Sequence, residues 1–236
     1  MRYLRISALG AVVAGLCVIT LSLNGCGRRE EGPTGEVKAI DAKTKDKPQE
    51  KEMPVPSTAP ITEERTYYDF ETSDLNGWEI PMWALDKTDY VAKGAELSRE
   101  VASHGDASMK VTTDFPGGLW SAALVEIQQY LVLSSYRVVR ADIYLPEDAP
   151  IGLKAKLILT VGNNWKFVEM SRSAPLIPGE WVTITANIEP GSYDWKRVVP
   201  DEKFAEDVRK IAIRIESNRK PKYSGPIYID NVRVGR

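Results

Sequence analysis

Hydrophobic and polar residues alternate with a period of two along most of the chain after residue 66. The alternating segments are Tyr67–Glu71, Met109–Thr113, Val139–Leu145, Leu153–Val161, Val182–Ile188, Ile211–Ile215 and Ile227–Ile229. This period places apolar side chains on one face of a β-strand and polar side chains on the other. Breaks rich in glycine and proline separate the segments, which is typical of turns between antiparallel strands. The pattern predicts an all-β fold, an antiparallel β-sandwich of the jelly-roll type.

One segment of this region departs from the strand pattern. Asp201–Lys210 carries Phe204 and Val208 one helical turn apart, and it is the only segment after residue 66 that looks helical. We therefore expect one short helix before the strand at Ile211–Ile215.

The N-terminus has the three parts of a secretory signal. Arg2 and Arg5 precede an almost wholly apolar run, residues 6–23, and the small-residue sequence Asn24-Gly25-Cys26 follows it. The run Leu23-Asn24-Gly25-Cys26 resembles the lipobox of bacterial lipoproteins, in which the cysteine is lipidated and becomes the first mature residue. The alternative is an uncleaved membrane anchor, because about 18 apolar residues can nearly span a bilayer. Residues 1–25 are thus predicted to be a lipoprotein signal peptide and Cys26 the site of lipidation.

Both readings place the rest of the chain outside the cytoplasm, at the cell envelope. The lipoprotein resemblance implies an outer-membrane destination if the cell has one, since Gly27 follows the cysteine and gives no retention signal. The chain has two cysteines, Cys17 and Cys26, of which the first lies in the signal peptide. The mature domain therefore has no disulfide and must be stabilised by burial.

Two regions follow the signal peptide. Residues 26–66 are rich in Lys, Glu, Asp, Pro and Thr, and the linker part of this range lacks apolar periodicity, so we predict a disordered tether behind the lipidated cysteine. Residues 67–236 have the size of one domain. The formal net charge is −2, and removal of Arg2 and Arg5 with the signal peptide makes it −4. This charge argues against a nucleic-acid partner.

Candidate catalytic groups are scarce. The one histidine, His104, lies in the turn-like run Ser103-His104-Gly105-Asp106, and no Gly-x-Ser-x-Gly motif marks a nucleophile. A zinc site would need several histidine or cysteine ligands, which the chain lacks. Counting acidic residues leaves a glycosidase carboxylate pair open, and a jelly-roll polysaccharide lyase also stays open in principle. We expect a protein that is not an enzyme.

Tryptophans carry more information. All six lie after residue 66, and packing is the default role of each. Trp78 and Trp181 fit that role. Trp83, Trp120 and Trp165 instead stand in polar settings bordered by loops, such as Gly162-Asn163-Asn164 before Trp165. Exposed indoles on one face would stack on sugar rings and form a saccharide-binding surface.

Several motifs resemble galactose-binding-like jelly rolls, and in particular the mannan-binding, family 27-like modules attached to bacterial β-mannanases. They are Asp69-Phe70-Glu71, Asn76-Gly77-Trp78, Gly105 to Val111, Val139 to Pro146, Pro178-Gly179-Glu180-Trp181-Val182-Thr183 and Tyr223 to Val232. The resemblance spans roughly residues 67–234. It implies a carbohydrate-binding β-jelly roll whose sugar groove is lined by Trp83, Trp120 and Trp165. In this comparison Trp83 could be exchanged with Trp78.

The same resemblance implies a structural calcium ion. It would join the first strand, the loop before Ser108 and the last strand, and the matching acids are Glu71, Asp106 and Asp230. Calcium prefers six to eight oxygen ligands from carboxylates and backbone carbonyls. The alternative is that these are ordinary acids of turns and strand edges.

Two hypotheses of function follow. The first is a non-catalytic lipoprotein that holds a polysaccharide, of the β-mannan or β-glucan class, at the envelope while its lipid binds the membrane. It predicts that Trp83, Trp120 and Trp165 are exposed along one face. The second is a structural or protein-interaction lipoprotein with no sugar ligand, and it predicts that these tryptophans are buried or scattered.

Overall fold

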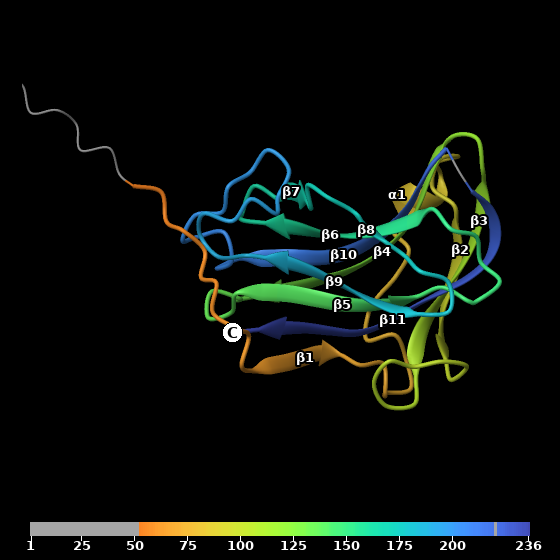
Figure 1. Ribbon diagram of the computed structural model, residues 1–236, viewed down its shortest axis with the longest axis horizontal. Helices are drawn as coiled ribbons and strands as arrows, with labels where there is room; N and C mark the ends of the chain where they lie inside the picture. Colours follow the sequence, from red (N-terminus) through yellow and green to blue (C-terminus); the bar gives the residue numbers. More distant parts are fainter. Residues whose placement is uncertain (1–51, 220) are drawn as a thin grey trace, which may run out of the picture. The chain divides into compact units, whose positions relative to one another are not determined.

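The computed structural model describes residues 52–219 and 221–236, which form two β-sheets and one four-residue helix (Figure 1). In chain order the elements are β1 (Glu64–Tyr68), α1 (Met82–Leu85), β2 (Ala92–Ser98), β3 (Ser108–Pro116), β4 (Trp120–Leu131), β5 (Val138–Tyr144), β6 (Leu153–Val161), β7 (Lys166–Glu169), β8 (Ala174–Pro175), β9 (Trp181–Asn187), β10 (Val208–Asn218) and β11 (Lys222–Gly235). The predicted all-β class is confirmed.

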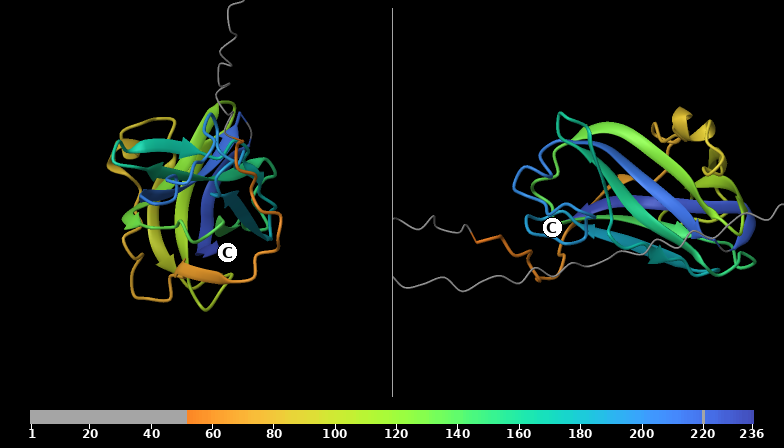
Figure 2. Two further views of the ribbon diagram at one scale, coloured as in Figure 1. Left: turned by 90° about the vertical axis from the view of Figure 1, so that its left-hand side faces the viewer. Right: turned by 90° about the horizontal axis from the view of Figure 1, so that it is seen from above.

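The strands divide into two antiparallel sheets that pack against each other (Figure 2). The first sheet has the order β2-β3-β11-β5-β9, and β1 pairs with the C-terminal part of β11. The second sheet has the order β4-β10-β6-β7, and β8 pairs with β6. Stacking of two antiparallel sheets is the architecture of a β-sandwich, as the alternation predicted.

The core lies between the sheets and is built by this alternation. In β10, Ile213 and Ile215 are fully buried, whereas Arg214 and Glu216 lie on the opposite, outer face. Each isoleucine that is removed from water in this way stabilises the fold by about 1.5–3 kcal/mol. The outer face of the second sheet is therefore free to carry polar and aromatic side chains.

β4 is the longest strand of the second sheet, and the period of two did not reveal it. Its core face carries Val125 and Ile127, but its outer face is also apolar around Leu124, which is 3% exposed. Tyr90 packs over that outer face. Because both faces are covered, the sequence of β4 reads as a nearly continuous apolar run.

The prediction of a helix at Asp201–Lys210 is wrong. The segment forms successive turns in which Phe204 N–H donates to the Asp201 carbonyl at 3.1 Å, and β10 then starts at Val208. Phe204 is buried against Trp195, with ring centroids 5.4 Å apart. The spacing of Phe204 and Val208 therefore serves tight turns followed by a core strand.

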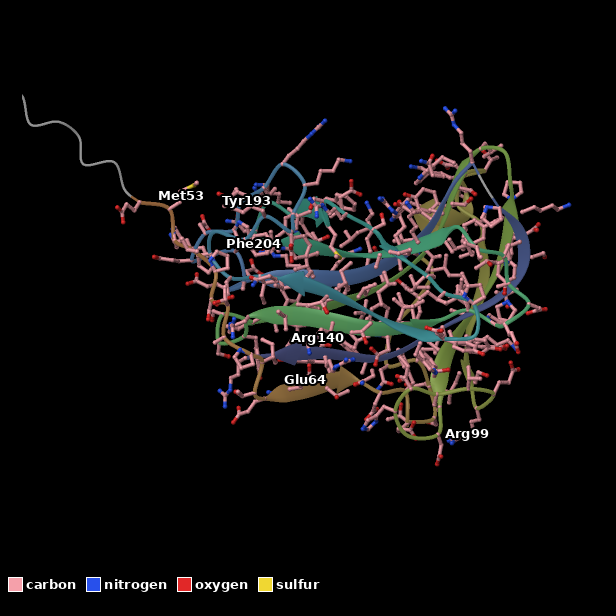
Figure 3. The ribbon with its side chains drawn as sticks, in the orientation of Figure 1. Met53, Glu64, Arg99, Arg140, Tyr193 and Phe204 are labelled. Atoms are coloured by element: carbon pink, nitrogen blue, oxygen red, sulfur yellow. The ribbon has the colours of Figure 1, made fainter. Side chains whose placement is uncertain are left out.

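The folded domain begins before the predicted boundary at residue 66. β1 pairs with β11, with Glu64 opposite Gly235. The Glu64 carboxylate also forms ion pairs with Arg140 on β5 and Arg233 on β11 (Figure 3). These contacts make β1 a strand of the first sheet.

Residues 54–63, which we call the N-terminal arm, also contact the domain. The guanidinium of Arg137 donates to the backbone carbonyls of Ser57, at 2.6 Å, and Ala59, at 2.9 Å. Glu189 pairs with the same guanidinium at 3.1 Å. The sequence of the arm does not indicate this contact, because the hydrogen-bond donors are side chains elsewhere in the domain.

The predicted signal peptide, residues 1–25, and Cys26 lie outside the described residues, as does most of the predicted tether. Among residues 52–219 and 221–236, no helix is both long and apolar enough to cross a bilayer.

Candidate functional site

The three predicted tryptophans lie on the outer face of the second sheet. Trp83 belongs to α1 and is 42% exposed, Trp165 lies in the turn between β6 and β7 and is 40% exposed, and Trp120 starts β4 and is partly exposed. We call this surface the tryptophan face. The hypothesis without a sugar ligand required buried or scattered rings, so the observed arrangement is the one that the saccharide hypothesis predicted.

Glycines shape the turn that presents Trp120. Gly117 and Gly118 both have positive φ, at 71° and 76°. A Cβ atom on Gly117 would lie 3.0 Å from the backbone nitrogen of Lys222, so a larger residue would clash as well as strain the backbone. The glycine pair lets the chain turn sharply beside β11 and enter β4 at Trp120.

A second tight turn presents Trp165. The backbone N–H of Trp165 donates to the Gly162 carbonyl at 3.0 Å, and the φ of Trp165 is 53°. A non-glycine residue with positive φ is uncommon, and such strain is concentrated at functional positions. The turn thus holds the indole at the end of the sheet.

The segment before α1 is fixed to the edge of β4. Glu79 and Glu126 exchange two backbone hydrogen bonds of 2.9 Å. Trp78, one residue earlier, is 3% exposed and packs edge-on against Tyr68. Of the two interchangeable candidates, Trp83 is therefore the one on the tryptophan face.

An apolar hollow of about 300 Å³ lies between Trp83 and Trp165. Its floor is formed by Leu124, Ile158 and Ala212. Its walls are formed by Trp83, Glu126, Thr160, Trp165, Phe167 and Lys210. The hollow combines flat aromatic walls with a few polar groups, which is the composition of a ligand site.

A second hollow, of about 230 Å³, lies beside Trp120. Lys154, Ser173, Glu216 and Asn218 line it. In the register of the sheet, Asn218 faces Trp120 across the β10–β4 pair, and Glu216 faces Lys154 across the β10–β6 pair. An indole and several hydrogen-bonding groups therefore meet at this end of the tryptophan face.

A network of charged side chains occupies the sheet between these hollows. Arg214 lies 2.5 Å from the Glu169 carboxylate and 3.2 Å from that of Glu216. Lys196 reaches Glu169 at 2.7 Å, and Lys156 approaches Glu216 at 3.6 Å. Burial raises the pKa of the Glu169 carboxyl, but the hydrogen bond from Lys196 and the charge of Arg214 outweigh it and hold that pKa below its usual value. Ionised groups in such pairs form strong hydrogen bonds with hydroxyl groups.

A cation also lies near each exposed indole. Lys87 is 5.0 Å from the ring of Trp83 and Arg209 is 5.0 Å from that of Trp165. The guanidinium of Arg214 is 5.8 Å from the ring of Trp120. Sequence reasoning did not select these residues, although Arg214 occupies a polar position of the alternation at Ile211–Ile215.

Comparison with known proteins identifies the family. The model of the family Carbohydrate binding module 27 matches residues 82–236, which is more than half of the chain. This chain belongs to the carbohydrate binding module 27 family. A search of curated protein sequences found no match.

Solved structures agree with the fold of this family. One is the module CBM27-1 of Caldicellulosiruptor saccharolyticus in complex with mannohexaose, with 17% identity, a TM-score of 0.52 and coverage of 73% of this chain and 97% of that one. Another is CBM28, a module specific for non-crystalline cellulose, with 15% identity, a TM-score of 0.52 and coverage of 74% and 96%. At these identities the likeness shows the β-sandwich fold alone, and it confirms the predicted jelly roll.

Membership in the family makes the domain a non-catalytic carbohydrate-binding module, in agreement with the prediction that the chain is not an enzyme. His104, the histidine of the module, is exposed in a turn. Its backbone N–H donates to the Asp230 carboxylate at 3.0 Å. The histidine thus lies on the loop before β3 and does not belong to the tryptophan face.

The acids of the predicted calcium site hold the loop before β3. Glu71 accepts the N–H groups of Asp106 and Ala107, both at 2.8 Å. The fully buried Asp230 accepts the N–H groups of Ser103, at 2.8 Å, and of His104. These carboxylates bind hydrogen-bond donors of the loop.

Calcium would require oxygen atoms gathered around one point. Within residues 52–219 and 221–236, no three acidic, histidine or cysteine side chains are placed to hold a metal ion. Glu71, Asp106 and Asp230 are therefore not part of a three-residue cluster of this kind. Calcium binding stays a prediction from the resemblance, and no part of the function below depends on it.

Proposed function

We propose that this chain is a lipid-anchored envelope protein whose module binds a β-mannan at the tryptophan face. The observation that carries the proposal is the exposure of Trp83, Trp120 and Trp165 on one face of one sheet. The family match and the mannohexaose complex of a similar module support mannan as the ligand class. The lipobox-like sequence that ends at Cys26 supports anchoring outside the cytoplasm.

The chemistry of the tryptophan face suits a neutral polysaccharide. A pyranose ring has apolar C–H faces, which pack on indole rings, and hydroxyl groups around its edge. Arg214, Glu169 and Glu216 lie between the indoles and are already paired with one another. The network therefore offers charged hydrogen-bond partners for hydroxyl groups.

Affinity gel electrophoresis of the full chain in β-mannan, mixed-linkage β-glucan and cellulose gels tests the proposal. We expect retention in mannan, and the variants Trp120→Ala and Trp165→Ala should each weaken binding at least about 30-fold, because tryptophans dominate contact energy at such surfaces. Trp181→Ala is the matched control, because Trp181 packs against Tyr144 on the other sheet.

Unchanged retention of both variants, with folding intact, would refute the tryptophan face as the binding site. Retention in β-glucan and not in mannan would assign the other polysaccharide class. Retention in none of the three gels would refute a polysaccharide ligand of these classes.

A further inference from the structure

Tyr90 lies between α1 and β2, on the outer face of the second sheet, and its neighbours in sequence are bonded to both sheets. The N–H of Val91 donates to the Ala122 carbonyl at 2.8 Å, and the N–H of Ala122 donates to the Asp89 carbonyl at 2.9 Å. The N–H of Asp114, on β3, donates to the Val91 carbonyl at 3.0 Å. The backbone on both sides of Tyr90 is thus fixed to β3 in one sheet and to β4 in the other.

The ring of Tyr90 touches two of the three exposed indoles. It makes edge-on contacts with Trp83, at 5.0 Å between centroids and 77° between planes, and with Trp120, at 6.1 Å and 79°. It also packs on Leu124, Ile158 and Ala212, which floor the apolar hollow. Edge-on aromatic pairs are a favoured geometry, so one ring fixes the angle of both indoles.

The charged network lies near the Tyr90 hydroxyl. Burial raises the pKa of that hydroxyl, and the positive charge of Arg214 acts in the opposite direction. Arg214 is itself held by Glu169 and Glu216. The backbone bonds on both sides of Tyr90 and its two ring contacts leave it little freedom to move when a ligand binds.

Trp165 has a separate support. Tyr130 meets it edge-on at 6.3 Å, and Arg209, paired with Asp207 at 2.9 Å, lies over both rings. The tryptophan face thus contains one unit around Tyr90, with Trp83 and Trp120, and another around Tyr130, with Trp165.

We propose that Tyr90 is a positioning residue that joins Trp83 and Trp120 into one preorganised platform for a single polysaccharide chain, while Trp165 acts as an independent platform. This inference rests on the proposed function. Ordering of side chains is a cost of binding, and prior fixation of two indoles by one partly buried ring lowers that cost. Tyr90 acts through the indoles and need not contact the sugar.

Isothermal titration of the full chain with mannohexaose tests the role of Tyr90. We expect Tyr90→Leu to weaken binding about tenfold, the size of the aromatic pair contacts it removes, and Tyr90→Phe to stay within about threefold of the wild type. Tyr193→Leu is the matched control, because Tyr193 is 72% exposed and its ring contacts none of the three indoles among the described residues. If Tyr90→Leu does not fold, Tyr90→Met replaces it with the same expectation.

A double-mutant cycle separates positioning from a general loss of structure. Trp83→Ala and Trp120→Ala should be strongly non-additive with Tyr90 present and additive in the Tyr90→Leu background, whereas Trp120→Ala and Trp165→Ala, which line different hollows, should be additive in both. If Trp120→Ala weakens binding but Tyr90→Leu does not, the positioning role is overturned and the proposed function stands. If Trp120→Ala has no effect, the proposed binding site itself fails.

Discussion

Asp230 illustrates how a single side chain can organise a loop. It is fully buried on β11, and its carboxylate accepts the N–H groups of Ser103 and His104 and the hydroxyl of Ser103. Burial raises the pKa of this carboxyl, while the N–H donors of the loop act to lower it. The loop before β3 is therefore attached to the last strand by one acid.

We expect Asp230→Ala to lower the free energy of unfolding by about 1–3 kcal/mol, because it leaves these donors without their acceptor. Thermal unfolding in the presence of EDTA measures this loss without any contribution from calcium. Asp106→Ala, at an exposed acid of the same loop, is the control and should have little effect. Equal stability of Asp230→Ala and wild type in EDTA would show that the hydrogen bonds are unimportant and would favour a metal-dependent role.

At the scale of single residues, the sequence could suggest candidate binding residues but could not show where they lie in the fold. It pointed to Trp83, Trp120 and Trp165 through their polar neighbours, yet it left Trp78 as a substitute for Trp83. Burial decides between them, and burial depends on packing against Tyr68, which is on another element. The cations near the rings, such as Arg209, were also out of reach because they come from different strands.

Strands in which hydrophobic and polar residues alternate strictly could be predicted from the sequence. Strands covered on both faces, and segments held by side chains distant in the sequence, could not. β10 shows the first case, since its isoleucines face the core and its charged residues face outward. β4 shows the second, because Tyr90 covers its outer face. The N-terminal arm shows the third, because a side chain distant in sequence holds it.

Arg137→Met should detach the N-terminal arm. The change removes two hydrogen bonds from the guanidinium to backbone carbonyls of the arm but keeps the aliphatic part of the side chain. We expect the free energy of unfolding to fall by about 1–2 kcal/mol, and backbone amides of residues 57–63 to exchange hydrogen faster. Hydrogen-exchange mass spectrometry measures the exchange. Arg99→Met, at an exposed loop position, is the control (Figure 3). Unchanged hydrogen exchange of the arm in Arg137→Met would contradict the contact between the arm and the domain.

At the scale of the whole molecule, the two sheets have different outer faces. The first sheet carries the ion pairs of Glu64 that attach β1, and the second carries the exposed indoles and the network around Arg214. Fold class followed from alternation, because strands with one apolar face must be covered, and a chain with a single short predicted helix can cover them only by stacking sheets. Which sheet carries the exposed indoles did not follow, since it depends on turns that bring Trp83 and Trp165 to the same side.

The proposed anchoring can be tested separately from the proposed binding, because the two proposals concern different parts of the chain. Cys26 is the residue that the lipobox-like sequence marks for lipid, and the tryptophan face belongs to residues 82–236. We expect Cys26→Ser to abolish incorporation of labelled palmitate and to move the protein from the membrane fraction to the soluble fraction of bacterial cells, because a cysteine thiol is needed for lipidation. Affinity for mannan should stay within about twofold, since the module is unchanged. Cys17→Ser is the control and should leave the protein in the membrane fraction, whereas membrane retention of Cys26→Ser would favour an uncleaved apolar anchor at residues 6–23.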